Sequence, residues 1–354
     1  MTHDSAANNA TGAGGGGHGG SSRPGRQLLI VRHGERVDFT FNTSTEHWMD
    51  RVFDENGKYQ RLSINMPRVL PHREDGFVHY ANDSPLTEIG YLQAKLVGRA
   101  LRDSGVKIKC AYSSPAYRCV QTTAGLLKGM QVSDISINIE PGLFEWCGWT
   151  KPDLPNWMKP REFLKQGINV NVKYTPVLSV DDLSVSESIE YFYSRSHRTA
   201  KKIIDTNTND KDAVILLVGH AATLDVCSRQ LLGKPPRTVQ DFYAFLHKVP
   251  YLSVARLQET LVPCGSIGSG SGQPGGHHHL GHGGGSMNSS GVPQYSSVTG
   301  GIRQQSQQQQ QHQFINPLTS SLYSSKWSVA EPPVLPLAHQ SNGGFDWKFM
   351  LSVS

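Results

Sequence analysis

The chain has 354 residues and a formal net charge of +5, from 34 Lys and Arg against 29 Asp and Glu. No block of Lys or Arg stands out, so the charge gives little support for a nucleic-acid surface and equally suits an anionic substrate. Five cysteines without a C-x-x-C pair argue against a disulfide framework or zinc site and favour a reducing compartment. The longest apolar run, 213–218, is too short to span a membrane, and the N-terminus lacks a signal pattern. We therefore expect a soluble, cytoplasmic protein with no membrane or nucleic-acid partner.

Two segments are too rich in glycine and polar residues to form a core. Residues 1–26 consist mainly of Gly, Ser, Ala and Asn, and residues 263–323 are Gly- and Ser-rich before a run of Gln. Such sequences bury too little apolar surface to offset the entropy of ordering the chain. We predict a disordered leader at 1–26, a disordered low-complexity insertion at 263–323, and a folded domain made of 27–262 and 324–354.

The first predicted elements are a buried strand and a long excursion. Residues 27–31 form an apolar run that leads into Arg32-His33-Gly34, which is typical of a strand ending in a loop. Residues 37–83 predict a loop-rich excursion. Thr87 is the expected N-cap of a helix, because apolar residues then recur at helical spacing until Gly105.

Strands and helices alternate along the rest of the domain. Strands are predicted at 108–112, 135–139 and 213–218. Helices are predicted at 115–129, opened by Pro115, at 186–204, capped by Ser186, and at 221–232. This alternation predicts an α/β fold with a mostly parallel sheet and helices on both faces. In such sheets the ligand binds beyond the carboxyl ends of the strands.

Six side chains suited to phosphoryl chemistry follow the predicted strands. His33 comes after the first strand, between Arg32 and Arg36, and His220 follows the strand expected to be the last. Arg118 lies in the first turn of the helix after the second strand, and Glu145 comes after the third. We expect these side chains to face a common crevice at one edge of the sheet.

The residue types in this set match the needs of phosphoryl transfer without a metal. Arginine binds phosphate oxygens with planar forked donors and keeps its charge. Neutral imidazole is a nucleophile near physiological pH, and a carboxyl group can give and take the proton of an alcohol or water. Each residue alone has a plainer interpretation: His33 as a surface histidine, His220 as a core histidine, Arg118 as a solvated helix residue. Their joint placement at strand ends favours the interpretation that they form a functional site.

Several motifs resemble one known family. Leu29-Ile30-Val31-Arg32-His33-Gly34-Glu35-Arg36 is similar to the signature of the histidine phosphatase superfamily, in the branch of phosphoglycerate mutases and fructose-bisphosphatases. Ser84-Pro85-Leu86-Thr87, Ser113-Ser114-Pro115 with Arg118, and Gly219-His220-Ala221 resemble its later blocks in the same order. Within the superfamily, Glu140-Pro141-Gly142-Leu143-Phe144-Glu145-Trp146 and Pro333-Val334-Leu335-Pro336-Leu337 resemble the C-terminal phosphatase domain of TULA/Sts proteins, which insect ecdysteroid-phosphate phosphatase shares.

The resemblance implies roles for the six side chains. His33 would be the nucleophile that forms a phosphohistidine, and Glu145 would be the proton donor. Arg32, Arg36, Arg118 and His220 would form the phosphate pocket, with His220 also a catalytic group. The resemblance further implies a phosphoglycerate mutase-like fold, no metal, no cofactor and a homodimer.

Three functions remain open. The first is hydrolysis of a phosphomonoester, either a steroid (ecdysteroid) phosphate or a phosphotyrosyl protein. The second is a sugar-phosphate mutase or bisphosphatase, which is disfavoured because we expect aromatic side chains of the excursion at the mouth of the site, namely Phe39, Phe41, Trp48, Phe53 and Tyr59. The third is a non-catalytic signalling or binding module, which the six intact positions disfavour.

The segment before the predicted domain bears on the choice of substrate. TULA/Sts proteins carry a ubiquitin-associated domain and a Src-homology-3 domain there, whereas this sequence has a Gly-rich stretch. We expect this difference to favour a small-molecule substrate, the alternative being that the chain is a short form of a longer product.

Overall fold

The computed structural model describes residues 22–263, 323–337 and 344–352. The strands are β1 (Arg23–Arg32), β2 (Ile108–Ser113), β3 (Ile137–Ile139), β4 (Val214–Gly219), β5 (Val254–Pro263) and β6 (Tyr323–Ala330). The helices are α1 (Val37–Phe41), α2 (Trp48–Val52), α3 (Glu88–Asp103), α4 (Tyr117–Met130), α5 (Pro160–Lys165), α6 (Ile189–Thr206), α7 (Thr223–Val226) and α8 (Val239–Leu246). Short 3₁₀ turns are Phe77–Ala81, Pro141–Leu143, Cys147–Thr150, Val180–Asp182 and Trp347–Leu351. The disorder predicted for 1–21 and 264–322 lies outside the described residues.

The described strands form one sheet in the order β3-β2-β4-β1-β5-β6. β1 pairs in parallel with β4, and β2 pairs in parallel with both β4 and β3. β5 runs antiparallel to β1. Arg32 lies opposite Gly219 in the register, and Ser113 lies opposite Val218 and Ile139. Four strands therefore end at the same edge, as the sequence predicted for a mostly parallel sheet.

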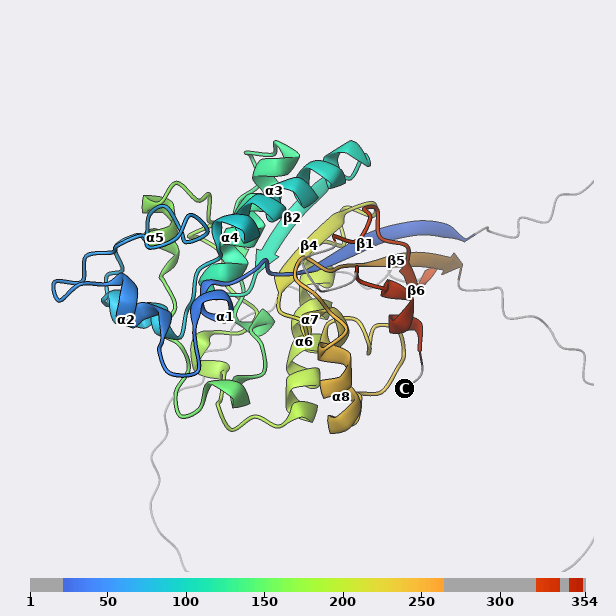
Figure 1. Cartoon of the computed structure of the whole chain (residues 1–354). Helices are drawn as coiled ribbons and strands as arrows, with labels where there is room; N and C mark the ends of the chain where they lie inside the picture. The colour runs from blue at the N-terminus through green and yellow to red at the C-terminus, as the bar shows by residue number, and fades with distance from the viewer. Residues whose placement is uncertain (1–21, 264–322, 338–343, 353–354) are drawn as a thin grey trace, which may run out of the picture. The chain divides into compact units, whose positions relative to one another are not determined.

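Helices cover both faces of this sheet because the central strands are apolar on both sides. In β1, Leu29 and Val31 join a core with α3 and α4, whereas Leu28 and Ile30 join a second core with α6 and α8. Figure 1 shows α3 and α4 above the strands and α6, α7 and α8 below them. The predicted α/β fold class is confirmed.

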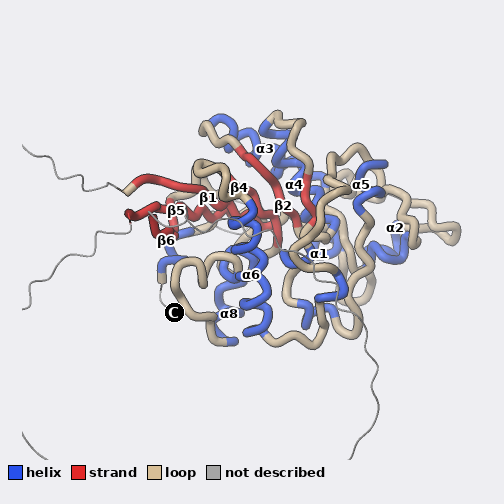
Figure 2. Tube along the Cα trace, turned by 180° about the vertical axis from the view of Figure 1, so that it is seen from behind, coloured by secondary structure: helices blue, strands red, loops and turns tan. Residues whose placement is uncertain are grey.

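The excursion between β1 and α3 is mostly loop, with the short helices α1 and α2 (Figure 2). α3 then begins as predicted, because the Thr87 hydroxyl accepts the N–H of Gly90 at 2.9 Å. The excursion is thus fixed at both ends by elements that also bound the site.

Several predicted boundaries are wrong. β1 begins at Arg23, inside the predicted leader, because Arg26 forms an ion pair with Glu259 of β5. α4 begins at Tyr117 rather than Pro115, and α6 is capped by Ser188 rather than Ser186. The predicted helix 221–232 reduces to α7 followed by turns. β4 is not the last strand, since β5 and β6, which no apolar run indicated, follow it.

Glycines let α3 and α4 pack with their backbones in contact. A Cβ added at Gly98 would lie 2.1 Å from the carbonyl oxygen of Leu126, and one at Gly129 would lie 2.0 Å from that of Lys95. Both distances are far below van der Waals contact, so neither position accepts a larger residue without moving a helix. This packing fixes α4, the helix that carries Arg118.

We predict that Gly98→Ala lowers the free energy of unfolding by about 1–3 kcal/mol through overpacking. Helix propensity alone would give the opposite sign, a gain of about 1 kcal/mol. Urea unfolding measures the difference. The neighbouring Arg99→Ala is the control, because Arg99 is exposed and its ion pair with Asp103 is a surface pair at 3.7 Å. A Gly98→Ala protein as stable as the parent would contradict the tight packing of α3 on α4.

Candidate active site

The two histidines of the predicted site lie side by side past the paired ends of β1 and β4. The His33 N–H donates to the carbonyl of Gly219 at 2.9 Å, so the ladder between β1 and β4 continues into the site. The ring centroids of His33 and His220 are 5.5 Å apart. Their closeness follows from the register, in which Arg32 and Gly219 are opposite each other.

His33 is held as a neutral imidazole. It is 3 % exposed, and its Nδ1 lies 2.8 Å from the carbonyl oxygen of Gly34. A carbonyl only accepts, so Nδ1 carries the proton and Nε2 keeps its lone pair. Burial lowers the pKa of His33 well below its ordinary value, and the charges of Arg118 and Arg32 lower it further. A buried neutral imidazole with a free lone pair is a potential nucleophile.

Arg118, Glu145 and His220 are in direct contact. The Nη2 of Arg118 donates to Glu145 Oε1 at 2.5 Å and to the Nδ1 of His220 at 3.2 Å. Because Nδ1 of His220 accepts, its Nε2 carries the proton and donates to the Ser114 hydroxyl at 2.8 Å. Burial lowers the pKa of His220 to about 3 against the opposing charge of Glu145. Arg118 thus links the carboxylate and the second histidine.

Glu145 is ionised in this arrangement. Burial alone would raise the pKa of its carboxyl group, but His220 and the neighbouring arginines, Arg118 foremost, lower it to about 2. Its side chain is 19 % exposed and lines a cleft, so it is the most open of the contacting groups. The direction of this side chain, which the sequence left open, is toward Arg118 and His220.

Arg32 and Arg36 complete the positive cluster with different partners. Arg36 forms a two-pronged ion pair with Asp38, which raises its pKa although burial opposes this. Arg32 donates to the carbonyl of Val249, and its guanidinium carbon lies 4.4 Å from the centre of the Tyr251 ring. Burial lowers the pKa of Arg32 to about 10. Both arginines act on the titration of His33 and Glu145, so all six predicted side chains come together.

Two buried donors of this cluster have no partner among the described residues. They are the Nε atoms of Arg32 and Arg118. A buried polar group without a hydrogen bond is costly, and an anionic oxygen is the acceptor that suits a guanidinium. The donor set therefore fits a tetrahedral anion such as phosphate.

A cleft of about 650 Å³ leads to this cluster. Arg36 and Glu145 belong to its wall, and its apolar part includes Phe39, which is 70 % exposed, and Trp149, which is 42 % exposed. The expectation that five aromatics of the excursion surround the mouth holds for Phe39 alone. Trp48 is fully buried, and Phe41, Phe53 and Tyr59 pack against the core.

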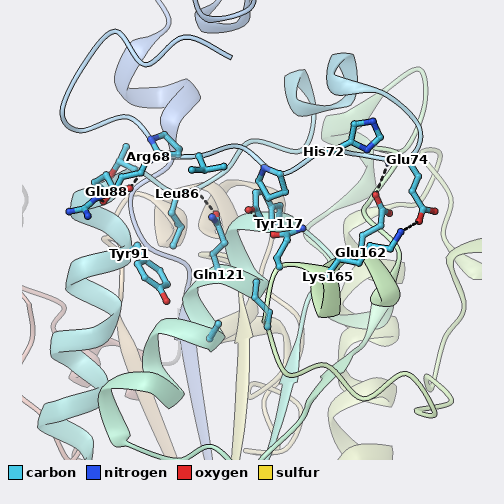
Figure 3. A pocket seen from close by; sticks show the side chains of 17 residues that line it. Arg68, His72, Glu74, Leu86, Glu88, Tyr91, Tyr117, Gln121, Glu162 and Lys165 are labelled. Atoms are coloured by element: carbon cyan, nitrogen blue, oxygen red, sulfur yellow. Dashed lines mark hydrogen bonds and ion pairs between the residues drawn. The ribbon is translucent and has the colours of Figure 1, made fainter. Parts of the chain in front are cut away.

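A second cavity of similar volume, about 650 Å³, lies among α3, α4, α5 and the excursion (Figure 3). None of the six site residues lines it. Gln121 reaches across it, and its side-chain oxygen accepts the N–H of Leu86 at 2.7 Å. Leu86 in turn forms a β-bridge with Arg36. Gln121, in the wall of this cavity, is therefore linked through Leu86 to the segment that holds Arg36.

Sequence reasoning missed several residues that hold the predicted ones. Ser114 directly follows β2, so the strand-end rule that selected His33 and His220 could have found it. Asp38 is a local partner of Arg36, two residues away. Thr122, whose hydroxyl accepts the N–H of Gly34 at 3.0 Å, lies in the block with Arg118 that resembles the superfamily, but the resemblance gave it no role. Tyr251 precedes β5, which was itself not predicted.

Two structural findings concern the setting of the protein. No helix among the described residues is long and apolar enough to cross a membrane. The cysteines of the described part, Cys110, Cys119, Cys147 and Cys227, are all free thiols.

Comparison with known proteins identifies the family. The model of the histidine phosphatase superfamily (branch 1) matches residues 71–262, more than half of the chain. The chain belongs to this superfamily. The matched range begins after Arg32-His33-Gly34, so the placement of His33 in the site rests on the fold.

The relatives include proteins named for phosphatase activity and for signalling domains. Ecdysteroid-phosphate phosphatase of Drosophila melanogaster is 41 % identical over 237 residues, which are 66 % of this chain and 30 % of that protein. Ubiquitin-associated and SH3 domain-containing protein B of Mus musculus is 33 % identical over 333 residues, 93 % of this chain and 42 % of that protein. The chain thus spans less than half the length of these two relatives.

A solved structure is similar over most of the chain. The crystal structure of ecdysone phosphate phosphatase from Bombyx mori, in complex with tungstate, has a TM-score of 0.63 and 28 % sequence identity. The similarity covers 92 % of this chain and 99 % of that one.

The depressed pKa of His33 predicts how stability depends on pH. An unfolded histidine has a pKa of about 6.5. Below about pH 6.5 the unfolded state therefore binds a proton at this histidine that the folded state does not bind. The free energy of unfolding falls as the pH decreases through this range. His33→Asn keeps a donor for the Gly34 carbonyl but cannot titrate. It should reduce the slope of unfolding free energy between pH 6 and 5 by up to about 1.4 kcal/mol per pH unit.

Urea unfolding at pH 7, 6 and 5 tests this prediction. His72→Asn is the control, because His72 is exposed and lies outside the cluster. An unchanged slope in His33→Asn would show that His33 is not held neutral by the fold.

Proposed function

We propose that the chain hydrolyses phosphomonoesters through a phosphohistidine formed on His33. The observation that carries this proposal is the state of His33, a buried neutral imidazole with its Nδ1 proton bound by Gly34 and its Nε2 lone pair available. Membership of the histidine phosphatase superfamily and the likeness to a phosphatase that binds the tetrahedral oxyanion tungstate support it.

In the first step, Nε2 of His33 forms a bond to phosphorus as the bond from phosphorus to the alcohol oxygen breaks. Arg32, Arg36 and Arg118 bind the phosphoryl oxygens and stabilise the charge of the transition state, as arginines do in other phosphoryl transfers. His220 belongs to the same pocket, because its Nδ1 holds Arg118 in place. This arrangement supplies the positive charge from side chains, so we propose that neither a metal nor a cofactor is needed.

Glu145 is the group that we propose to protonate the leaving oxygen. Its carboxylate is ionised in the free protein because the arginines lower its pKa. A bound phosphate dianion compensates those arginines and adds negative charge beside Glu145, so the pKa of Glu145 rises when substrate binds. In the second step the carboxylate accepts a proton from the water that attacks phosphorus. Inorganic phosphate leaves and His33 returns to its neutral state.

The lining of the cleft indicates which class of alcohol the phosphomonoester substrate contains. Its charged lining is two cationic side chains, Arg36 and Lys151, and three carboxylates, namely Asp38, Glu145 and Asp153. That balance disfavours the doubly anionic substrate of a sugar-phosphate mutase or bisphosphatase. The exposed rings of Phe39 and Trp149 instead suit a bulky apolar group. We propose a steroid phosphate or a phosphotyrosyl side chain as substrate, the first being what the insect relatives are named for.

A homodimer and a cytoplasmic location are further parts of this proposal. The dimer rests on the family resemblance, and sedimentation equilibrium of the purified chain would test it. The free thiols of the described cysteines fit a reducing compartment.

The covalent intermediate gives one prediction. His33→Ala should lose more than about 10³-fold in kcat, because removing a nucleophile leaves only binding and electrostatic contributions. In the unaltered protein, rapid quenching during turnover should trap phosphate in an acid-labile, base-stable linkage on His33. EDTA should leave turnover unchanged. Activity of His33→Ala above a tenth of the parent value would contradict the assignment.

The proton donor gives another prediction. Glu145→Gln keeps the size of the side chain but removes the proton, so it should matter most for poor leaving groups. For 2-phenylethyl phosphate, which leaves as a basic alkoxide, kcat/KM should fall by about 10²–10⁴-fold. The value of kcat/KM should fall less for phenyl phosphate and least for 4-nitrophenyl phosphate. An equal loss on all three esters would mean that Glu145 orients Arg118 rather than donating a proton.

A further inference from the structure

The segment that carries Glu145 has no regular structure of its own. Residues 142–147 run from one 3₁₀ turn to the next and are largely buried, with Leu143 and Phe144 each 1 % exposed. Their buried carbonyl groups need donors, because an unpaired buried carbonyl is destabilising. The carbonyl of Trp146 accepts the backbone N–H of Trp149 at 3.1 Å, whereas those of Gly142, Phe144 and Glu145 accept from the donors of a side chain.

Arg195 of α6 supplies them. Its Nη1 donates to the carbonyl oxygens of Gly142 and Phe144, each at 3.1 Å, and its Nη2 donates to the carbonyl of Glu145, also at 3.1 Å. The side chain is fully buried and is not among those that line the cleft. One buried guanidinium thus donates to three carbonyl groups within four consecutive residues. One of these carbonyl groups is that of Glu145.

Glu187 fixes the guanidinium in this orientation. Its two carboxylate oxygens accept from Nε and Nη2 of Arg195 at 2.9 and 2.7 Å. The same carboxylate accepts the N–H of Cys147 at 2.8 Å, and the Glu187 carbonyl accepts the indole N–H of Trp146 at 2.9 Å. With the three carbonyls, all five N–H donors of Arg195 are engaged. The pair therefore holds the segment on both sides of Glu145.

We infer that Arg195, oriented by Glu187, is a positioning residue that sets where the Glu145 carboxyl group stands relative to the leaving oxygen. The inference rests on the proposed role of Glu145 in proton transfer. Arg195 touches neither the cleft nor His33, whose own anchors are Gly219 and Gly34. Loss of the hydrogen bonds from Arg195 to these carbonyl groups should therefore impair proton transfer and leave the nucleophile in place.

Arg195→Lys is the test, because lysine keeps the charge beside Glu187 but lacks the planar set of five donors. A misplacement of about 1 Å can cost about 10²-fold in rate. We expect kcat/KM for 2-phenylethyl phosphate to fall by about 10- to 100-fold and that for 4-nitrophenyl phosphate by less than about threefold.

Arg26→Lys is the matched control. Arg26 also forms a two-pronged pair with a buried carboxylate, Glu259, and donates to a backbone carbonyl of α6, that of Ile204 at 2.8 Å. It lies near the start of β1, at the far end of the strand from His33. The ratio of the two kcat/KM values should stay at its parent value in Arg26→Lys.

A double-mutant cycle separates this inference from the proposed role of Glu145. In the Glu145→Gln background, Arg195→Lys should add no further loss on 2-phenylethyl phosphate, because the group that it positions is already gone. Equal losses on both esters in Arg195→Lys, or losses that multiply in the double variant, would overturn the inference. Equal losses in Glu145→Gln alone would instead overturn the acid role, while the cycle still reports whether Arg195 acts through Glu145.

Circular dichroism shows whether Arg195→Lys is folded. If it is not, the double variant Arg195→Met/Glu187→Leu serves as the test. Replacing both members of a buried pair with apolar residues of similar size is often tolerated, whereas removing one is strongly destabilising. The same selective loss on 2-phenylethyl phosphate is expected. A folded double replacement with the parent ratio of rates would overturn the inference.

Discussion

The concentration of positive charge at one sheet edge is the constraint on which the site depends. Arg32, Arg36 and Arg118 converge on His33, and Asp38 compensates Arg36 alone. Glu145 is left to face Arg118, and it does so as an ion. The same field, added to burial, keeps His33 neutral. A phosphate dianion would balance this charge, so in the mechanism that we propose the binding of phosphate and the neutral state of the nucleophile have one physical origin.

The sheet turns this charge cluster into a rigid arrangement. The N–H of His33 binds the carbonyl of Gly219, and the N–H of Ser114 binds that of Val218, both at 2.9 Å. These bonds continue the strand ladders past the last residues of β1 and β2. Because β4 lies between these two strands, His220 stands between His33 and Ser114. The site backbone is therefore an extension of the sheet rather than a set of independent loops.

The same physics explains what could be predicted. Apolar runs that end in His33 and His220 indicate buried parallel strands, and parallel strands bring their ends together. β5 was hidden because Glu259 interrupts its apolar pattern, and its partner Arg26 is 233 residues away. The aromatics of the excursion were misplaced for a related reason. The ring centroids of Phe53 and Phe77 lie 4.7 Å apart, and both rings pack against the main core, which a loop-like composition does not reveal.

In the mechanism that we propose, the nucleophile and the proton donor are held by different parts of the fold. His33 is fixed by the backbone hydrogen bonds of the ladder between β1 and β4 rather than by a side chain of α6. Glu145 lies in irregular backbone, which cannot satisfy its own carbonyls and takes a donor from Arg195, 50 residues further along the chain. A core substitution that shifts α6 should therefore act on proton transfer before it acts on attack at phosphorus. The dependence of kcat/KM on the leaving group then reports on the packing of the sheet face covered by α6. Activity on an aryl ester with a good leaving group does not.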